Sequence, residues 1–486
     1  MAKKKPAPSL PFPQKGTDAA SIKEQLANAA ANDKNWRRGR TFSLVFYPGD
    51  EVSEVSKQAY LAFSYENGLN VSAFPSLRKF ETEVVAMSIA LMNGDADVVG
   101  NMTSGGTESI LCAVKTAKNK WAKENADTIP EVIVPQSAHP AFDKACDYFG
   151  LKLVHVPVDK QTLRADVAAM EKAITPNTVM IVGSAPSYPH GLIDPIEDLA
   201  KVAQKHHLLF HVDACVGGYA LPFVERLGYP VPKFDFRVPG VTSISMDLHK
   251  YGYATKGASV VLYKNSVLRK NQYFLYTEWT GGIYISPTVT GTRPGGPIAA
   301  AWAVLNFLGE EGYLRINKAV MEATEKIIAG INAIEGLYVI GKPEMSVLGF
   351  TSDKYDIFRI GDEMNLKGWH IDKQQNPDSL HLTISYGNVQ AVDDFLTDLK
   401  EAVKQAKKLT LDKIGGKVAV GLVKGASKVL PEKQMSKLTQ AVAKMGGTGV
   451  PKRSAAMYGV MGAISNEGDL NEILLNLMDG LNKMEQ

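Results

Sequence analysis

The sequence predicts an α/β protein with a mostly parallel sheet flanked by helices and a smaller C-terminal α/β domain. Between residues 98 and 265, short apolar runs alternate with amphipathic helical stretches, the pattern of parallel strands joined by helical crossovers. The chain has 486 residues, more than the roughly 250–300 that one hydrophobic core usually reaches. We therefore expect an N-terminal tail and helical segment at 1–75, a large domain at 76–310 and a small C-terminal domain at 311–486.

The composition excludes several classes of protein. A formal net charge of +3 provides no basic field for binding nucleic acid. Three cysteines are too few for a disulfide framework and favour a reducing compartment. The longest apolar runs, such as residues 84–92, are shorter than the roughly 20 residues that span a bilayer. We expect a cytoplasmic protein with no transmembrane segment and no nucleic-acid partner.

The first 92 residues predict a tail followed by helices. Residues 1–20 are rich in Lys, Pro and small side chains, which is typical of a flexible tail. A helix is expected over Ser21–Asn35, with Ser21 as its N-cap and Glu24 completing a capping box. The run Phe42–Tyr47 is expected to be extended, and further helices are expected over 52–66 and from 77 toward 92.

The large domain supplies the candidate site. Strands are expected at 98–100, 131–135, 152–157, 179–183, 208–212, 241–246 and 258–263, and helices at 110–124, 141–149, 166–173 and 196–206. Ligands of such sheets bind beyond the carboxyl ends of the strands, so residues that directly follow strands are the candidates. Further on, a long helix at 298–330 precedes strands at 337–340, 345–351 and 380–385 and a helix at 391–408, whereas 409–452 shows no clean period.

A Thr-Ser-Gly-Gly-Thr turn at 103–107 lies between a strand and a helix. Ser104, Gly105, Gly106 and Thr107 let the backbone approach an anion, and the helix N-terminus offers unpaired N–H groups. The alternative is ordinary helix capping. The Walker spacing is absent, which disfavours a nucleoside triphosphatase.

Two more polar residues follow strands. Asp213 ends one and can hold a protonated pyridine nitrogen, as a pyridoxal ring requires, although a cap or salt bridge is the alternative. His139 follows another and can stack on a flat cofactor, unless it is a hydrogen-bonded structural histidine. His206, His207 and His211 flank a strand and share no helix face, so we expect no metal site.

The turn that carries His249 and Lys250 joins two strand-like runs. Apolar neighbours would remove water from the Lys250 amine and lower its pKa, which suits a lysine that attacks a carbonyl. The alternative is a surface lysine in a hairpin turn. The order of phosphate turn, His139, Asp213 and Lys250, each after a predicted strand, is more specific than any single motif.

The combination resembles the pyridoxal-phosphate enzymes of fold type I and, within them, the sphingosine-1-phosphate lyase family. The similar segments are 104–109, 136–139, 211–215, 240–257, 279–287 and 293–296, with a weaker echo at 456–459. The resemblance implies a homodimer with shared active sites that acts on a small-molecule amine. In it, Lys250 would bind pyridoxal 5'-phosphate covalently, His139 would stack on its ring and Asp213 would pair with its nitrogen. The cofactor phosphate would be held by Ser104, Gly105, Gly106, Thr107 and His249, and across the dimer by Gly291 and Thr292.

The substrate side departs from the family in two places. Phe46 stands where the lyases have a tyrosine, with Tyr47 beside it, and Asn70 stands where they have a histidine. Lys256 would lie near a substrate phosphate, and Lys250, His249 and Tyr47 are candidates for moving protons. The leading hypothesis is retro-aldol cleavage of a phosphorylated long-chain base to a fatty aldehyde and phosphoethanolamine. An amino-acid decarboxylase and a non-catalytic scaffold remain as alternatives.

Overall fold

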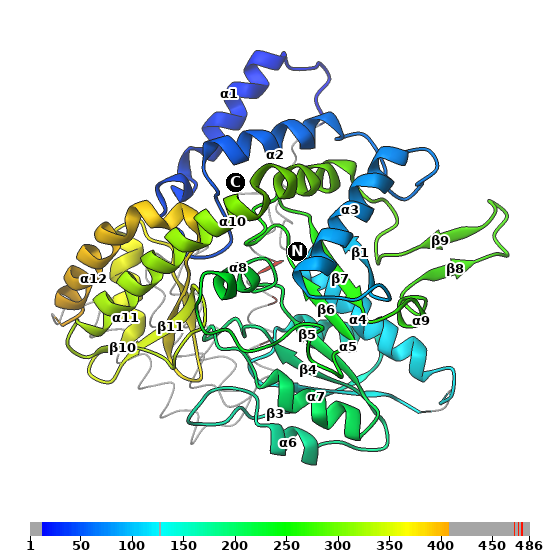
Figure 1. Ribbon diagram of the computed structural model, residues 1–486. Coiled ribbons are helices and arrows are strands. Elements are labelled where there is room, and N and C mark those ends of the chain that lie inside the picture. Colours follow the sequence, from blue (N-terminus) through cyan, green and yellow to red (C-terminus); the bar gives the residue numbers. More distant parts are fainter. Residues whose placement is uncertain (1–11, 126–127, 408–470, 472–474, 476–477, 480–486) are drawn as a thin grey trace, which may run out of the picture. The chain divides into compact units, whose positions relative to one another are not determined.

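The computed structural model describes residues 12–125, 128–407, 471, 475 and 478–479 (Figure 1). It forms two compact units: a large unit of residues 36–351 and 381–396, and a small unit from the described parts of 1–35, 352–380 and 397–486. Residues 1–11 of the expected tail, the stretch 409–452 and the segment 456–459 lie outside the described residues. No helix within the described ranges is both long enough and apolar enough to cross a bilayer.

The unit boundaries differ from those expected near residues 75 and 310. Helices α2 (Asp50–Ala62) and α3 (Pro75–Leu91) both pack against α10 (Gly295–Asn332). The expected boundary at 310 adjoins a kink in α10 at Gly309, where φ is 55° and ψ is −173°. Both arms of α10 nevertheless belong to the large unit, because packing against α2 and α3 joins residues 36–75 and 311–351 to the sheet domain.

A seven-stranded sheet organises the large unit (Figure 1). Its strands are β1 (Val99–Thr103), β2 (Glu131–Pro135), β3 (Lys152–Val156), β4 (Thr178–Ser184), β5 (Leu209–Asp213), β6 (Ser243–Met246) and β7 (Ser259–Tyr263), in the order β1-β7-β6-β5-β4-β2-β3. Strands β2 to β6 are parallel, and β7 is antiparallel to both β6 and β1. The predicted mostly parallel sheet is confirmed.

Helices cover both faces of this sheet. They are α4 (Gly106–Trp121), α5 (Ala141–Phe149), α6 (Val167–Lys172), α7 (Ile196–Lys205), α8 (Leu221–Arg226) and α9 (Ser266–Arg269). Val182 of β4 packs in the core with Phe142 of α5, whereas the next residue, Gly183, faces Ile196 and Leu199 of α7. Neighbouring strand residues point to opposite faces, so α5 and α7 lie on opposite sides of the sheet.

The rest of the chain forms smaller elements. Strands β8 (Phe274–Tyr276) and β9 (Tyr284–Ser286) form a two-stranded hairpin that projects from the large unit (Figure 1). A four-stranded sheet has the order β10-β11-β13-β12. These strands and the neighbouring helices are β10 (Leu337–Val339), β11 (Val347–Ser352), α11 (Ile357–Leu366), β12 (Asp372–Gln374), β13 (Ser379–Thr383), η3 (Tyr386–Ala391) and α12 (Val392–Lys407).

Two local predictions near the N-terminus are wrong. Helix α1 (Ala19–Ala29) is capped by Asp18, whose Oδ1 accepts the Ser21 N–H at 2.9 Å, so Ser21 lies in the first turn and is not the cap. Between η2 (Trp36–Arg38) and α2, the expected extended run Phe42–Tyr47 forms no strand. Leu44 adopts a left-handed φ of 65°, which interrupts an extended conformation.

Candidate active site

Three segments of the large unit meet at one edge of the sheet. Asp213 is the last residue of β5 and pairs in register with Ser245 of β6, so both chains leave the sheet side by side. Asp247 follows β6 directly. Gly106, the first residue of α4, lies against the same place, since a Cβ there would be 2.8 Å from an Asp247 oxygen. The phosphate turn and the ends of β5 and β6 therefore converge as the sequence predicted.

The environment of Lys250 is charged, and this corrects an expectation. Its Nζ lies 2.9 Å from Oδ2 of Asp247, a carboxylate buried three residues earlier. Burial is the largest single influence and lowers the pKa of Lys250, but the charge and hydrogen bond of Asp247, together with the nearby Cys215 and Asp213, outweigh it, and the pKa is raised. The predicted fall in pKa is therefore wrong. Asp247 lies in the same turn as Lys250, and its i, i+3 spacing was the signal that sequence reasoning missed.

Asp213 is held by one of its two carboxylate oxygens. Oδ1 accepts the Cys215 N–H at 3.0 Å and the Ser245 hydroxyl at 3.2 Å. Among the described residues, Oδ2 has no hydrogen-bond partner. The carboxylate is thus fixed in orientation while one oxygen stays available to a ligand.

His249 is a neutral imidazole at neutral pH. Burial lowers its pKa to about 4, although the nearby Asp247 charge acts in the opposite direction. Its Nδ1 lies 3.2 Å from the Ala258 N–H and accepts it, so the ring proton is on Nε2. An added Cβ on Gly105 would lie 3.3 Å from the ring, so a larger residue there would press against this N–H donor beside the phosphate turn.

Glu108 fastens two loops together, and sequence reasoning missed it. Its Oε2 accepts the Ser104 N–H at 2.7 Å, and its Oε1 accepts the Val289 and Thr290 N–H groups at 2.9 and 3.1 Å. The phosphate turn and the loop that precedes Gly291 and Thr292 are therefore held by a single buried carboxylate. The Thr107 side chain is exposed and has no partner among the described residues.

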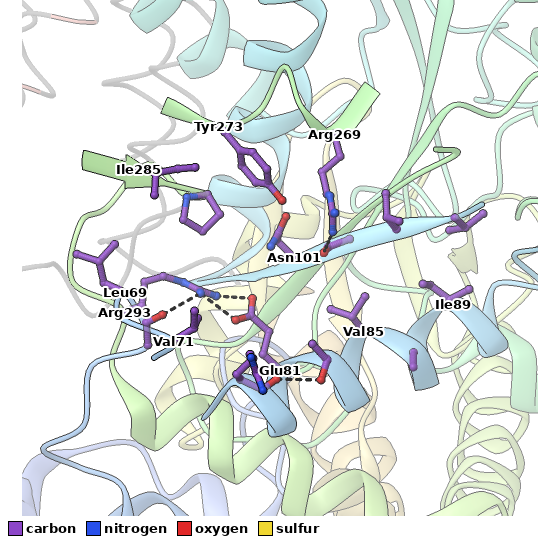
Figure 2. A pocket seen from close by; sticks show the side chains of 18 residues that line it. Leu69, Val71, Glu81, Val85, Ile89, Asn101, Arg269, Tyr273, Ile285 and Arg293 are labelled. Carbon is purple, nitrogen blue, oxygen red and sulfur yellow. Dashed lines mark hydrogen bonds and ion pairs between the residues drawn. The ribbon is translucent and has the colours of Figure 1, made fainter. Parts of the chain in front are cut away.

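A buried ion pair borders two cavities near this edge. Figure 2 shows Arg293 and Glu81 pointing toward one another, with N–O distances of 2.5 and 2.8 Å. Arg293 borders a small cavity beside Ser104 and Gly257, and on its other side a cavity of about 460 Å³. The larger cavity is mainly apolar, with Leu69, Val71, Val85, Ile89 and Ile285 in its lining, and contains none of the predicted site residues.

Other predicted residues lie at or beyond the rim. His139 is exposed, and its Nδ1 accepts the Ala141 N–H at 3.1 Å, which fixes the ring at the start of α5. Asn70 is exposed and caps a turn through the N–H groups of Ser72 and Ala73. No described hydrogen bond connects either residue to Lys250, and their proposed roles stay predictions.

Phe46 and Tyr47 have different surroundings. The Phe46 ring packs edge-on against Tyr251 at 5.1 Å, and Lys256 Nζ lies 5.1 Å from the centre of the Phe46 ring. Tyr47 instead donates its hydroxyl to Asp50, and this hydrogen bond raises its pKa. The structure therefore links Phe46, and not Tyr47, to the turn that carries Lys250.

Lys256 is an unusual cation. Its Nζ donates to the carbonyl oxygen of His249 at 3.2 Å, and no carboxylate pairs with it among the described residues. Desolvation, reinforced by the neighbouring Lys250 charge, lowers its pKa to about 8. Although part of the side chain is exposed to solvent, an acidic ligand would find no competing acid at this ammonium.

The donor set fits pyridoxal phosphate. The start of α4 offers backbone N–H groups that have no partner within the helix, beside two glycines and the His249 N–H, as a phosphate needs. Asp213 has one oxygen free that could pair with a ring nitrogen, and Lys250 lies close enough to Asp213 for the carboxylate charge to act on its amine. The described residues contain no cluster of three His, Cys, Asp or Glu side chains that could hold a metal ion. The fold and this site define a pyridoxal-phosphate-dependent enzyme.

Comparisons with known proteins identify the family. Residues 61–352 match the pyridoxal-dependent decarboxylase conserved domain. The chain is 43% identical over 476 residues to a sphingosine-1-phosphate lyase of Arabidopsis thaliana, covering 96% of this chain and 80% of the relative. It is 42% identical over 427 residues to sphingosine-1-phosphate lyase 1 of Rattus norvegicus, covering 87% of this chain and 74% of the relative.

Solved structures agree with this placement. The sphingosine-1-phosphate lyase of Burkholderia pseudomallei superposes with a TM-score of 0.79 at 40% identity, over 87% of this chain and 97% of that one. A glutamate decarboxylase of Lactobacillus brevis shares the fold, with a TM-score of 0.72 and 20% identity. The match covers 84% of this chain and 98% of that one. The chain belongs to the pyridoxal-dependent decarboxylase family and, within it, to the sphingosine-1-phosphate lyase family. It is a pyridoxal-phosphate-dependent lyase.

Proposed function

We propose that the enzyme cleaves the C2–C3 bond of a phosphorylated long-chain base and releases a fatty aldehyde and phosphoethanolamine. The main observation in favour of a phosphorylated substrate is Lys256, six residues after Lys250. Its ammonium has no carboxylate partner in the described structure. Its contact with the Phe46 ring places a cation beside an apolar surface, the combination that a phosphate on an amphiphile requires.

The cofactor side has a defined set of proposed holders. Lys250 would bind pyridoxal phosphate covalently, Asp213 would hold its ring nitrogen and His139 would cover its ring. Ser104, Gly105, Gly106, Thr107 and His249 would hold its phosphate. When bound, the cofactor supplies the electron sink that makes cleavage of a bond to C2 feasible.

Two proton transfers fall to the residues of the chain. The 3-hydroxyl of the substrate must lose a proton as it becomes the aldehyde, and C2 must gain one. His249 already carries its proton on Nε2 and uses Nδ1 to accept the Ala258 N–H, so it suits hydrogen-bond donation to a phosphate better than proton removal. Tyr47 is bound to Asp50 and has a raised pKa. Lys250 is best placed for both transfers: as a neutral amine it would accept the 3-hydroxyl proton, and the resulting ammonium, which Asp247 stabilises, would donate a proton to C2.

We also propose a cytoplasmic homodimer in which Gly291 and Thr292 reach the partner's cofactor phosphate. Thr292 is exposed. The β8–β9 hairpin carries exposed large apolar side chains, among them Phe274, Leu275, Trp279, Ile283 and Ile285, which favours burial against another surface. All three cysteines are free and buried, in keeping with a reducing compartment. Light scattering of the purified protein and localisation of a tagged chain test these two points.

An aldehyde-trapping assay tests the reaction. The purified holoenzyme should release aldehyde from a phosphorylated long-chain base and much less from the unphosphorylated base. Lys256→Ala should raise KM for the phosphorylated base about tenfold or more, the loss of one charge-assisted contact, with a smaller change in kcat. Release of carbon dioxide from amino acids without aldehyde would favour the decarboxylase alternative, and absence of both would favour the scaffold.

A further inference from the structure

A line of buried polar side chains lies directly behind Asp213. His211 precedes it by two residues on β5, and Ser243 and Ser245 occupy the facing positions of β6. The register pairs His211 with Ser243 and Asp213 with Ser245, so all four side chains lie on one face of the sheet. His211 and Ser245 are fully buried. Buried polar groups of this kind are costly unless each finds a partner.

Every member of the line has a partner. His211 Nδ1 lies 2.8 Å from the Ser243 hydroxyl and its Nε2 lies 3.1 Å from the Ser245 hydroxyl. Ser245 in turn donates to Asp213 Oδ1 at 3.2 Å. The Cys215 thiol also reaches Ser245, at 3.3 Å.

The donor and acceptor capacities allow one direction only. A hydroxyl has one proton, and Ser245 gives it to the carboxylate, so His211 Nε2 must donate to Ser245. His211 is neutral because burial lowers its pKa to about 4, which leaves Nδ1 to accept from Ser243. The chain therefore runs from Ser243 through His211 and Ser245 to Asp213, with each donor pointing toward the carboxylate.

We propose that His211 is a positioning residue for the cofactor: through Ser245 it orients the Asp213 carboxylate. Successive hydrogen bonds in a dry interior polarise one another, and a charged acceptor at the end gains most. Oδ1 is thereby occupied on the protein side, and Oδ2 faces the ligand as the acceptor for a protonated ring nitrogen. The inference rests on the proposed role of Asp213.

The test measures cofactor binding and ring protonation, not turnover. Apo protein is titrated with pyridoxal phosphate to obtain Kd, and pyridoxal phosphate isotope-labelled at the ring nitrogen reports its protonation by NMR. Ser245→Ala should raise Kd about tenfold, the loss of one hydrogen bond to a charged group, and His211→Leu, which removes the donor to Ser245, should raise Kd in the same direction. Both should shift the nitrogen resonance toward the unprotonated form. His211→Gln, whose amide can still donate to Ser245, should retain the wild-type resonance.

Matched variants separate the outcomes. Ser243→Ala removes the far end of the chain and should have the smallest effect on Kd. If His211→Leu destabilises the fold, Ser245→Ala decides, because it removes a single hydroxyl. Wild-type Kd and resonance in Ser245→Ala, or a His211→Gln variant as impaired as His211→Leu, would overturn the inference. Wild-type behaviour of Asp213→Asn would instead overturn the assignment of Asp213 itself, and with it the premise.

Discussion

The cofactor side and the substrate side of the site are built differently. On the cofactor side, the carboxylates of Asp213, Asp247 and Glu108 are buried and each is held by specific donors, whereas Ser104, Thr107 and His139 are exposed. On the substrate side, Lys256 and Asn70 are exposed and bond mainly to backbone groups, and Phe46 is only partly buried. Replacing a buried, partnered charge leaves its partner unsatisfied, whereas an exposed side chain can change at little cost.

The difference explains where this chain departs from the lyases it resembles. Both departures expected from the sequence, Phe46 and Asn70, fall on the predicted substrate side, where water can replace a lost partner. The cofactor side retains the residues that the resemblance requires. We infer that the chemistry is constrained by burial and that substrate choice is adjusted on the exposed side, and four experiments test this contrast.

The largest expected effect is at Lys250. Lys250→Ala should abolish the cofactor adduct and reduce lyase activity by about 10⁴-fold, as expected for loss of a covalent catalytic group. Borohydride reduction followed by peptide mapping checks the adduct in the wild type and the variant. Lys256→Ala is the matched control and should keep the adduct on Lys250. An adduct on any other lysine would remove the basis of the contrast.

The second-largest effect is expected on stability when Asp247, the negative charge beside Lys250, is replaced. Asp247→Asn in the apo protein should lower the free energy of unfolding at pH 7 by about 3 kcal/mol, because Lys250 loses its buried partner. The folded pKa of Lys250 is raised, so the stability from this pair is fully present below pH 10.5 and is lost as the pH rises through the folded pKa. Asp95→Asn, which breaks the exposed Asp95–Lys264 pair, is the control and should change urea unfolding little. Equal effects of the two variants would argue against a special role for burial.

The third effect is a pH dependence at His211. Its pKa is about 4 in the folded protein, below the ordinary value of 6.5, so it contributes stability above pH 6.5 that is lost as the pH falls toward 4. Between pH 7 and 5 the wild type should lose about 2 kcal/mol more than His211→Gln in urea unfolding. His249 has the same direction of shift and is common to both proteins, so it cancels in the difference. Parallel losses in the two proteins would mean that His211 is not held neutral by burial.

The smallest effects are expected on the exposed side. Phe46→Tyr and Asn70→His, which restore the family residues, should change kcat/KM for a phosphorylated long-chain base by less than about tenfold. The absorption spectrum of the bound cofactor should not change. Phe46 contacts Lys256, which is not a predicted cofactor ligand, and Asn70 bonds to the backbone of its own turn. A large spectral change in either variant would show that the two sides are coupled.

Much of the site followed from local patterns. The positions of Asp213 and Lys250 after strands could be predicted, because apolar runs and turns mark the strand ends and parallel strands end at one edge. The sheet class followed from the same alternation. The capping of α1 by Asp18 was missed, because Ser21 offers an equally good local capping pattern.

Other features depend on contacts between distant parts of the chain. Glu81 and Arg293 are 212 residues apart, and Glu108 meets Thr290 across 182 residues. No local pattern distinguishes such partners from other charged residues, because pairing is decided by packing. The same holds for Phe46 and Tyr47, adjacent in sequence but directed to different neighbours.

By itself, the sequence determined the order of strands and turns, and with it which residues reach the edge of the sheet. The tertiary structure alone decided the charge state of that edge. A lysine among apolar residues would lose its proton more easily, but the fold buries Asp247 beside Lys250 and reverses the direction. The physical reason is that the strength of the Coulomb attraction and the loss of hydration depend on how deeply both groups are buried, and the i, i+3 spacing along the chain does not specify that burial.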